Sequence, residues 1–421
     1  MQLPDWLAHQ QAQHPNAIEL GLDRVREVAQ RLDLLPLAYP SIIVGGTNGK
    51  GSTVAFLTAL SRAAGRRTGT YTSPHLQRYN ERIAIDGAPV DDATLIRAFE
   101  RIEQARGDTP LTFFEYGTLA AFVIFDEAQV EAAVIEVGLG GRLDATNIID
   151  ADVAVLCSVG LDHQDWLGPT TEDIGREKAG IFRAGRSVVL GALEMPQSVY
   201  DAIARLNCRA QQLDRDFFFD TGSAGWRWRS AQYTFEALPM PALKGPIQLR
   251  NAATAMAAFM AWQRVCPNPT RELLAQGLTT ASLRGRFQCL KPRQPDEPEW
   301  ILDVAHNEDS ARVLAEGLKA SPVSGKTVGV VGILQDKDAM TIGEALAGVI
   351  DEWVLCGLDG PRGASAEALR ARLPAHCRSV ALAPDVSHGC ATARALTGHG
   401  DRIVVFGSFH VVGPALDWLG L

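Results

Sequence analysis

The stretch SIIVGGTNGKGSTVAFL, residues 41–57, joins a short apolar run to a glycine-rich turn and then to a helical pattern. A strand, a turn and a helix in this order are typical of a phosphate-binding loop. Glycines let the backbone approach a ligand closely, and the first turn of a helix presents unpaired N–H groups. The usual pattern is G-x-x-x-x-G-K-[ST], but here Gly45 lies one residue too close to Gly49, and Gly51 precedes the hydroxyl residue.

Two side chains of this stretch fit a phosphate site despite the irregular spacing. Lys50 adds a positive charge, and Ser52 offers a hydroxyl to a Mg²⁺ ion. A plain glycine-rich turn between a strand and a helix is the alternative. The strand–turn–helix context favours the phosphate site over that alternative.

The composition is ordinary for a soluble globular enzyme. The 421 residues, 46% hydrophobic and 21% charged, predict two or three domains at about 150 residues per domain. The net charge of −9 argues against nucleic acid or an anionic membrane as the main partner, because both reward a basic surface. Seven scattered cysteines without a C-x-x-C pair argue against a zinc site or disulfide framework and favour a reducing cytosol.

Neither a targeting segment nor a membrane segment is visible in the sequence. The N-terminal residues MQLPDWLAHQ lack the basic and apolar regions of a signal peptide. No apolar stretch approaches the ~18 residues that a membrane helix needs. We therefore expect a cytoplasmic protein.

Short apolar runs alternate with helical spacing over the first 200 residues, which predicts a parallel sheet covered by helices on both faces. The expected strands are 42–45, 68–72, 132–137, 153–159 and 187–191. The segments FFFD, WRWRS and YTFEAL within 213–240 predict a small antiparallel insert. Alternating tryptophan and arginine in WRWRS suit a base-stacking platform, but the period of two favours a half-buried strand.

A second domain is predicted towards the C-terminus. The segment QCLKPRQPDEPEW, residues 288–300, concentrates proline and charge, and we interpret it as a linker after a helix at 249–262. Strands are expected at 301–304, 327–332, 353–357, 379–383 and 402–407. The predicted fold class is α/β, with a phosphate-loop domain at 1–288 that carries the parallel-rich sheet and the insert, and a smaller Rossmann-like domain at 289–421.

Polar side chains follow three predicted strands of the first domain. They are Ser73 after TGTYT, Glu136 in AAVIEVGLGG and His163 in CSVGLDHQDWLG. Because ligands gather at the carboxyl ends of parallel strands, all three are expected near the mouth of the glycine-rich turn. Mg²⁺ prefers oxygen ligands and water, so His163 fits least well. Taken alone, a histidine such as His163 is more often a capped or core residue than a metal ligand. For Glu136 alone, a structural role and a metal-binding role are equally good interpretations.

Eight motifs, in order along the chain, together resemble one known family. They are GGTNGKGST, YTSPHLQRYNERIAIDG, TFFEYGTLAAF, EVGLGGRLDATNI, LDHQDWLG, REKAGIFRAG, LRGRFQ and DVAHN. They are similar to the bifunctional dihydrofolate synthase/folylpolyglutamate synthases of bacteria, within the Mur ligase superfamily. The resemblance runs from about residue 18 to the C-terminus. It also explains the irregular turn, because the superfamily uses the shorter G-T-x-G-K form.

The resemblance implies a Mur-ligase-type central domain followed by a C-terminal glutamate-ligase domain. It implies an ATP-dependent acid–amino-acid ligase of folate biosynthesis and one-carbon metabolism. Such an enzyme adds L-glutamate to dihydropteroate and to the glutamate tail of tetrahydrofolates through an acyl phosphate. The implied cofactors are ATP and two Mg²⁺ ions, with K⁺ as a further candidate. We expect a monomer that acts on these small molecules.

The resemblance also implies residue roles. The implied ATP-binding residues are Thr47, Asn48, Gly49, Lys50, Gly51, Ser52, Asn251, Arg286, Asp303 and His306, and the implied metal ligands are Ser73, Glu136 and His163. The pterin-bearing substrate is implied to contact Ile18, Glu19, Leu20, Thr112, Leu143, Asp144 and Ala145. The catalytic set is Lys50, His163 and Lys178. For glutamate we expect Ser408 and His410 in FGSFHVVG, where a plain strand exit is an equally good interpretation.

Lys178 matches a lysine that the superfamily often carries as a carbamate, N6-carboxylysine. A lysine within a helix is usually a solvated charge. A carbamate forms only from the neutral amine, so desolvation or a nearby metal must favour deprotonation. Two features depart from the commonest family pattern: Glu308 follows DVAHN in place of proline, and Leu143 precedes Asp144, as in the bifunctional bacterial branch.

Two other functions stay open from the sequence. A Mur ligase acting on a UDP-linked muramyl substrate would use the same chemistry, but it normally needs another domain before the loop, which here begins at residue 45. A P-loop switch or ATP-dependent binding protein would need no ligase residues. The carboxylate, lysine and histidine around the loop argue against it. Because Asp303 and Lys50 lie in different predicted domains, we expect domain closure to complete the site.

Overall fold

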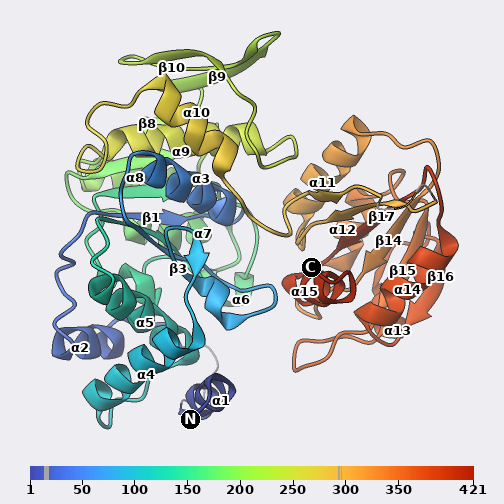
Figure 1. Cartoon of the computed structure of the whole chain (residues 1–421), viewed down its shortest axis with the longest axis horizontal. Coiled ribbons are helices and arrows are strands. Elements are labelled where there is room, and N and C mark those ends of the chain that lie inside the picture. The colour runs from blue at the N-terminus through green and yellow to red at the C-terminus, as the bar shows by residue number, and fades with distance from the viewer. Residues whose placement is uncertain (14–18, 293, 295) are drawn as a thin grey trace. The chain divides into compact units, whose positions relative to one another are not determined.

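The computed structural model describes residues 1–13, 19–292, 294 and 296–421, so the expectation for Ile18 lies outside the described residues. These residues form two compact units (Figure 1). One contains Met1–Ala242 and Leu249–Ser282, and the other contains Leu243–Gln248 and Leu283–Leu421. The chain therefore passes into the second unit before residue 288, where the sequence had suggested the boundary.

An eight-stranded sheet forms the centre of the N-terminal unit, in the order β4-β3-β2-β5-β1-β6-β7-β8. Its strands are β1 (Ser41–Gly45), β2 (Thr68–Tyr71), β3 (Ile83–Ile85), β4 (Ala88–Pro89), β5 (Ala132–Glu136), β6 (Val153–Leu156), β7 (Ser187–Leu190) and β8 (Arg209–Gln212). The six strands β2, β5, β1, β6, β7 and β8, in this spatial order, are parallel. The strands β3 and β4 add an antiparallel edge next to β2. The five strands predicted for this region are confirmed.

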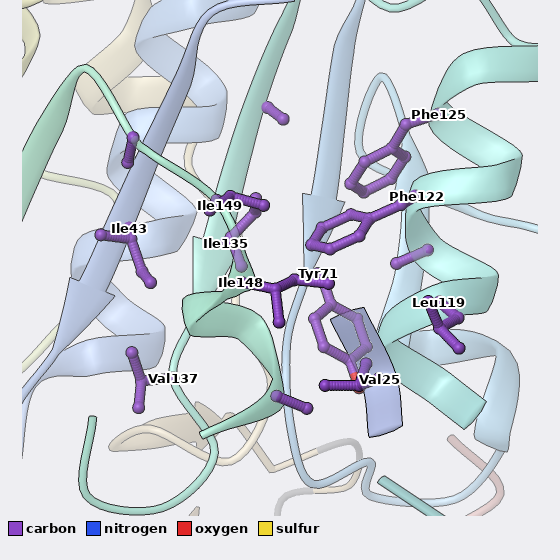
Figure 2. Close-up of a cluster of buried hydrophobic side chains, with 14 of the residues drawn as sticks. Val25, Ile43, Tyr71, Leu119, Phe122, Phe125, Ile135, Val137, Ile148 and Ile149 are labelled. Carbon is purple, nitrogen blue, oxygen red and sulfur yellow. The ribbon is translucent and has the colours of Figure 1, made fainter. Parts of the chain in front are cut away.

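Helices cover both faces of this sheet. They are α1 (Leu3–Gln13), α2 (Asp23–Arg31), α3 (Lys50–Ala63), α4 (Asp92–Arg106), α5 (Phe113–Glu127), α6 (Gln164–Leu167), α7 (Thr171–Lys178), α8 (Gln197–Arg205), α9 (Gln248–Ala261) and α10 (Arg271–Thr280), with 3₁₀ turns η1 (Tyr79–Arg82), η2 (Ala145–Ile148) and η3 (Ala179–Ile181). Figure 2 shows Phe122 and Phe125 of α5 pointing towards the strands of the sheet, in one buried cluster with Tyr71 of β2 and Ile135 of β5. Burial of these large apolar side chains fixes α5 on the sheet, since each contributes on the order of 2 kcal/mol.

A separate three-stranded antiparallel sheet confirms the predicted insert. It contains β9 (Phe217–Gly222), β10 (Gly225–Ser230) and β11 (Thr234–Leu238), with β10 in the middle. The rings of Trp226 and Trp228 are buried, and Trp228 Nε1 donates to the Ala253 carbonyl of α9 at 3.1 Å. The half-buried strand is therefore the correct interpretation, and the two rings are not available to stack on bases.

The C-terminal unit contains a six-stranded sheet in the order β12-β13-β17-β14-β15-β16. The strands are β12 (Gln288–Leu290), β13 (Glu299–Leu302), β14 (Thr327–Val331), β15 (Glu352–Cys356), β16 (Ser379–Ala383) and β17 (Arg402–Phe406), and the helices are α11 (Glu308–Ala320), α12 (Ala339–Ala345), α13 (Ala366–Arg372), α14 (Val386–Leu396) and α15 (Phe409–Trp418). All neighbouring strands are parallel except β12 and β13. The predicted α/β class of this unit is confirmed.

The proline-rich segment 288–300 corrects one prediction. Its two ends are β12 and β13, which pair antiparallel with Gln288 opposite Leu302 and Leu290 opposite Trp300. The segment is therefore part of the C-terminal sheet and is not a linker. Proline and charge concentrate in the connection between the edge strand β12 and its neighbour β13, where backbone pairing is not required.

Candidate active site

The phosphate loop (residues 45–52) takes a backbone conformation that needs glycine. Gly46 has φ 146° and Gly49 has φ 89°, a region that other residues adopt only with strain. Gly49 is the N-cap of α3, and a Cβ there would lie 2.9 Å from Asn251 Oδ1. The loop thus presents the amino end of α3 without a side chain in the way, as an anion site requires.

The segment that follows β6 holds the phosphate loop in place. Thr47 N donates to the Ser158 carbonyl at 2.9 Å, and Asn48 N donates to Ser158 Oγ at 3.0 Å. The Thr47 hydroxyl donates to the Gly160 carbonyl and accepts from Gly160 N. These bonds fix the loop before any ligand binds, which reduces the ordering cost of binding.

Lys50 folds back over the phosphate loop. Its Nζ donates to the Gly46 carbonyl at 2.9 Å and to the Thr47 carbonyl at 3.3 Å. These two hydrogen bonds hold the positive charge of the Lys50 ammonium beside the backbone of residues 46–47. Ser52 is buried in the first turn of α3. The loop therefore combines a cation, a helix N-terminus and a hydroxyl, as the sequence predicted.

The structure brings two of the three expected metal ligands together. β2 and β5 are neighbours, and Ser73 N, just after β2, donates to Glu136 Oε2 at 3.4 Å. Glu136 is buried at the end of β5. A carboxylate and a hydroxyl are hard oxygen donors, which suits Mg²⁺ with water completing its coordination.

His163 is placed less clearly for metal binding. It has φ 52°, precedes α6, and its Nε2 lies 3.9 Å from Asp162 Oδ1. Within the described ranges, no group of three or more His, Cys, Asp or Glu side chains is arranged to hold a metal ion. Of the three expected ligands, Glu136 and Ser73 fit a divalent cation because they offer oxygen donors at adjacent strand ends. The contribution of His163 stays a prediction.

Lys178 is not a solvated charge. It is the last residue of α7 and only 5% exposed. Burial, followed by the positive charge of Lys50, lowers its pKa to about 7. The loop before η2 packs on this end of α7, since Arg142 N donates to the Glu177 carbonyl at 2.8 Å. The sequence does not show this burial, because the covering residues lie some 35 positions away.

Three of the residues expected around the pterin, Leu143, Asp144 and Ala145, lie at the turn that leads into η2, and the segment at Leu20 contacts this turn. Gly21 N, next to Leu20, donates to the Leu143 carbonyl at 3.3 Å. Asp144 is buried and accepts from Leu139 N at 2.8 Å and from Thr146 N at 3.0 Å. Burial raises the pKa of Asp144. The carboxylate shapes the turn that leads into η2, so it positions Leu143 and Ala145 whether or not it also contacts a ligand.

A second cluster lies at the exit of β13 in the C-terminal unit. Asp303 is partly buried and accepts from Phe287 N at 2.7 Å and from Ala305 N at 2.8 Å. Burial raises the pKa of Asp303, while the Arg286 guanidinium opposes that rise. His306 Nδ1 lies 2.8 Å from the Val304 carbonyl. Three residues expected at the nucleotide are thus neighbours within this unit.

The exit of β17 carries the two residues expected for glutamate. Gly407 has φ 120° and lets the chain pass the Gly332 carbonyl, which a Cβ would approach to 2.2 Å. Ser408 is buried, and within the described part of the chain its Oγ has no hydrogen-bond partner. His410 is exposed to solvent, but partial desolvation of its ring, followed by the positive charge of Arg362, lowers its pKa. An unpaired buried hydroxyl beside a neutral-leaning imidazole suits a polar ligand.

Comparison with known proteins identifies the family. Residues 44–210 match the Mur ligase middle domain, and residues 285–409 match the Mur ligase, glutamate ligase domain. A dihydrofolate synthase/folylpolyglutamate synthase of Escherichia coli strain K12 is 42% identical over 99% of this chain and 95% of its own length. That of Haemophilus influenzae is 39% identical over 97% of this chain and 96% of its own.

The chain belongs to the dihydrofolate synthase/folylpolyglutamate synthase family. Solved structures agree with the assignment. E. coli FolC in complex with DHPP and ADP has a TM-score of 0.93 and 40% identity, covering 100% of this chain and 98% of that one. A bifunctional folylpolyglutamate synthase/dihydrofolate synthase with Mn, AMPPNP and L-glutamate bound has a TM-score of 0.90 and 43% identity, with the same coverage. The expected resemblance and the expected fold class are confirmed.

The family motifs missed one ionic network that supports the expected pterin residues. Arg24 of α2 donates to Glu19 Oε1 at 2.6 Å and to Glu115 Oε1 at 3.2 Å. Glu115 in turn accepts from Thr112 N at 2.7 Å and closes a capping box at the start of α5. Arg24 thus ties the segment at Glu19 to Thr112. The T-x-x-E spacing was readable as a capping box, but the role of Arg24 was not, since it is 91 positions from its partner.

None of the helices in the described ranges is long and apolar enough to cross a membrane. The seven cysteines are all described and all are free thiols.

Proposed function

We propose that this protein joins L-glutamate to dihydropteroate, making dihydrofolate, and to the glutamate tail of tetrahydrofolates, using ATP. One observation carries the proposal: in a chain of this family, the phosphate loop between β1 and α3 lies on the sheet beside the Glu136–Ser73 pair at the exits of β5 and β2. A triphosphate and an acid substrate at this edge of the sheet would meet in one place.

The relatives support the choice of ligands. One related structure holds DHPP and ADP, and another holds Mn, AMPPNP and L-glutamate. We carry these classes of ligand over to this chain: an adenine nucleotide, a divalent cation, a pterin substrate and L-glutamate. A muramyl ligase is not favoured, because full-length relatives at 39–42% identity have the folate activities in their names.

The reaction must activate a carboxylate, which is a poor electrophile. A carboxylate oxygen attacks the γ-phosphorus of ATP, ADP leaves, and an acyl phosphate forms. The amine of glutamate then attacks the acyl carbon, and phosphate leaves with one proton released to solvent. The products are an amide, ADP and phosphate. Catalysis therefore depends on positioning and on offsetting negative charge.

The chain's own groups suit these steps. Lys50 and the loop N–H groups neutralise charge on the γ-phosphoryl group during transfer. Bound Mg²⁺ would supply further charge neutralisation through Glu136, Ser73 and, in our proposal, His163. Carbamylation would make Lys178 an additional anion. Asn251 borders the loop at Gly49, and Arg286, Asp303 and His306 of the C-terminal unit complete the proposed nucleotide residues.

The remaining residues are proposed for the other two substrates. Glu19, Leu20, Thr112, Leu143, Asp144 and Ala145 are proposed for the pterin. Ser408 and His410 are proposed for glutamate, with the unpaired Ser408 hydroxyl available to donate to a carboxylate. We also propose that the protein acts as a monomer.

Phosphate release tests this function directly. The purified protein is given ATP, Mg²⁺ and L-glutamate, with dihydropteroate, tetrahydrofolate or a UDP-linked muramyl substrate as the acceptor. We expect release that depends on each folate acceptor and on glutamate, and none above background with the muramyl substrate. Release that ignores both folate acceptors would overturn the proposal.

A further inference from the structure

Arg82 is a buried cation at the end of η1. Only 9% of the surface of Arg82 is exposed to solvent. Its Nε donates to His75 Nδ1 at 2.9 Å, and its guanidinium carbon lies 5.3 Å from the ring centroid of Tyr79 and 5.6 Å from that of Phe113. Two aromatic rings and an imidazole therefore surround the guanidinium.

The charge of Arg82 is not compensated by an acid. A guanidinium has five N–H donors, and within the described part of the chain only Nε meets an acceptor. No carboxylate among the described residues lies within 4.0 Å of it, whereas Arg24 and Arg402, also poorly exposed, both pair with glutamates. The Tyr79 hydroxyl beside it is also buried without a partner. Contacts with the rings offset only part of the cost of burying a cation.

The position of Arg82 connects it to the reaction. Its carbonyl accepts from Thr72 N at 2.9 Å, and the next residue, Ser73, donates to Glu136. Arg82 thus ends the loop that contains Ser73, and the backbone of Ser73 contacts the second proposed ligand, Glu136, at the end of β5. On its other side, Phe113 directly follows Thr112, a residue proposed for the pterin substrate.

We infer that Arg82 binds the carboxylate of the acceptor substrate, the group that becomes phosphorylated. This inference rests on the proposed function and assigns a recognition residue within it. Both acceptors end in a carboxylate, on the aminobenzoate of dihydropteroate and on the terminal glutamate of tetrahydrofolates. A single guanidinium near the metal ligands can therefore anchor acceptors of different length.

The two free amino groups of the guanidinium match the two oxygens of a carboxylate. Pairing also offsets the repulsion between the acceptor and the γ-phosphate, both of which are anions. The aromatic walls hold the fork in one orientation, so little side-chain freedom remains to be lost on binding.

A pair of ligands isolates the carboxylate. One is dihydropteroate, and the other is the anilinomethyl dihydropterin that has the same two rings but no carboxylate. Binding of each is measured by calorimetry with ADP and Mg²⁺ present, for the natural protein, Arg82→Gln, Arg82→Lys and the control Arg78→Gln. Arg78 lies in the same loop, but its side chain is 69% exposed and pairs with Asp92.

We expect the natural protein and Arg78→Gln to prefer dihydropteroate by about 10–100-fold, the usual effect of hydrogen bonds to a charged group. Arg82→Gln should lose this preference to within about two-fold, while binding of the uncharged analogue and of ADP is unchanged. Arg82→Lys should keep part of the preference, because the charge remains but the fork is lost. The KM for both folate acceptors should rise in Arg82→Gln, and the KM for ATP should not.

The outcomes separate this inference from the function on which it rests. If Arg82→Gln keeps the full preference for dihydropteroate, or weakens both ligands equally, Arg82 does not bind the carboxylate. If Arg82→Gln fails to fold, Arg82→Lys decides: a preference equal to that of the natural protein contradicts recognition by the guanidinium fork. If the natural protein shows no folate-dependent turnover, the proposed function itself fails.

Discussion

Lys178 gives a quantitative test of the site, because its pKa determines how much of its amine can react with CO₂ to form the expected carbamate. Burial and the neighbouring Lys50 lower the pKa of Lys178 to about 7. At about pH 7 roughly half of such amines are neutral, against about 1 in 3,000 for an ordinary lysine with a pKa near 10.5. Since only the neutral amine reacts with CO₂, carbamate formation at a given CO₂ concentration should rise by about a thousand-fold.

Lys50, which helps to lower the pKa of Lys178, also favours the carbamate once it has formed. Lys50 repels the Lys178 ammonium, but it attracts the anionic carbamate that replaces it. The two effects act in one direction, so residue 178 should carry the carbamate in preference to exposed lysines such as Lys319. Because the pKa of Lys178 is lowered, the effect is present above about pH 7 and is lost as protons return to the amine below it.

Carbon-13 NMR with labelled bicarbonate reports the carbamate directly. We expect one carbamate carbonyl resonance in the natural protein and in the control Lys319→Ala, and none in Lys178→Ala. The resonance should fade as the pH falls below about 7. Turnover should collapse in Lys178→Ala and recover partly with acetate, which supplies a carboxylate to the vacated space. An unlabelled natural protein, or a Lys178→Ala variant with full activity, would refute the reasoning.

Three further substitutions test the loop and the fold. Lys50→Ala should lower turnover by about 10²–10³-fold with an unchanged melting temperature, and near-normal turnover would contradict the phosphate-site assignment. Gly49→Ala should cost about 1–2 kcal/mol of unfolding free energy, since φ is 89° and the new Cβ meets Asn251 Oδ1, and should weaken ADP binding in calorimetry; an unchanged midpoint in urea would argue against this strain. Burial alone would raise the pKa of Glu103, but hydrogen bonds led by that from Arg106 lower it to about 2. The carboxylate therefore stabilises the fold above the ordinary pKa of 4.5, and this stabilisation is lost as the pH falls through about 2. Above pH 4.5, Glu103→Gln should lower the free energy of unfolding measured in urea by about 1 kcal/mol after solvent screening. This difference from the natural protein should shrink as the pH falls from 4.5 to about 2. A deficit independent of pH would show that packing, not charge, stabilises this contact.

Local patterns made the phosphate loop and the strands predictable. Residues 41–57 carry their own signal, because a buried parallel strand, glycines at positive φ and a helix N-terminus are all set by neighbours in the chain. The same holds for the insert, whose period of two placed both tryptophans on the buried face. The carboxyl ends of the predicted parallel strands also grouped Ser73 with Glu136, and the register between β2 and β5 explains why they lie together.

Predictions failed where distant residues decide the outcome. The segment 288–300 has the composition of a linker, but pairing of β12 with β13 makes it an edge of the sheet. Lys178 has the helical context of a surface lysine, but the turn after β5 covers it. Composition measures what a segment exposes on average, and it contains no information about which remote segment packs on it.

The charge of the whole chain and the charge of its active edge have opposite consequences. A net charge of −9 disfavours binding of polyanions such as nucleic acids, yet Lys50 and Arg82 place cations at the carboxyl edge of the sheet, where anionic substrates are expected. A carbamate at Lys178 would replace an amine that is about half protonated near pH 7 with a negative charge. We therefore expect carbamylation to make the charge of this edge more negative by between one and two units, which would favour a divalent cation beside the triphosphate.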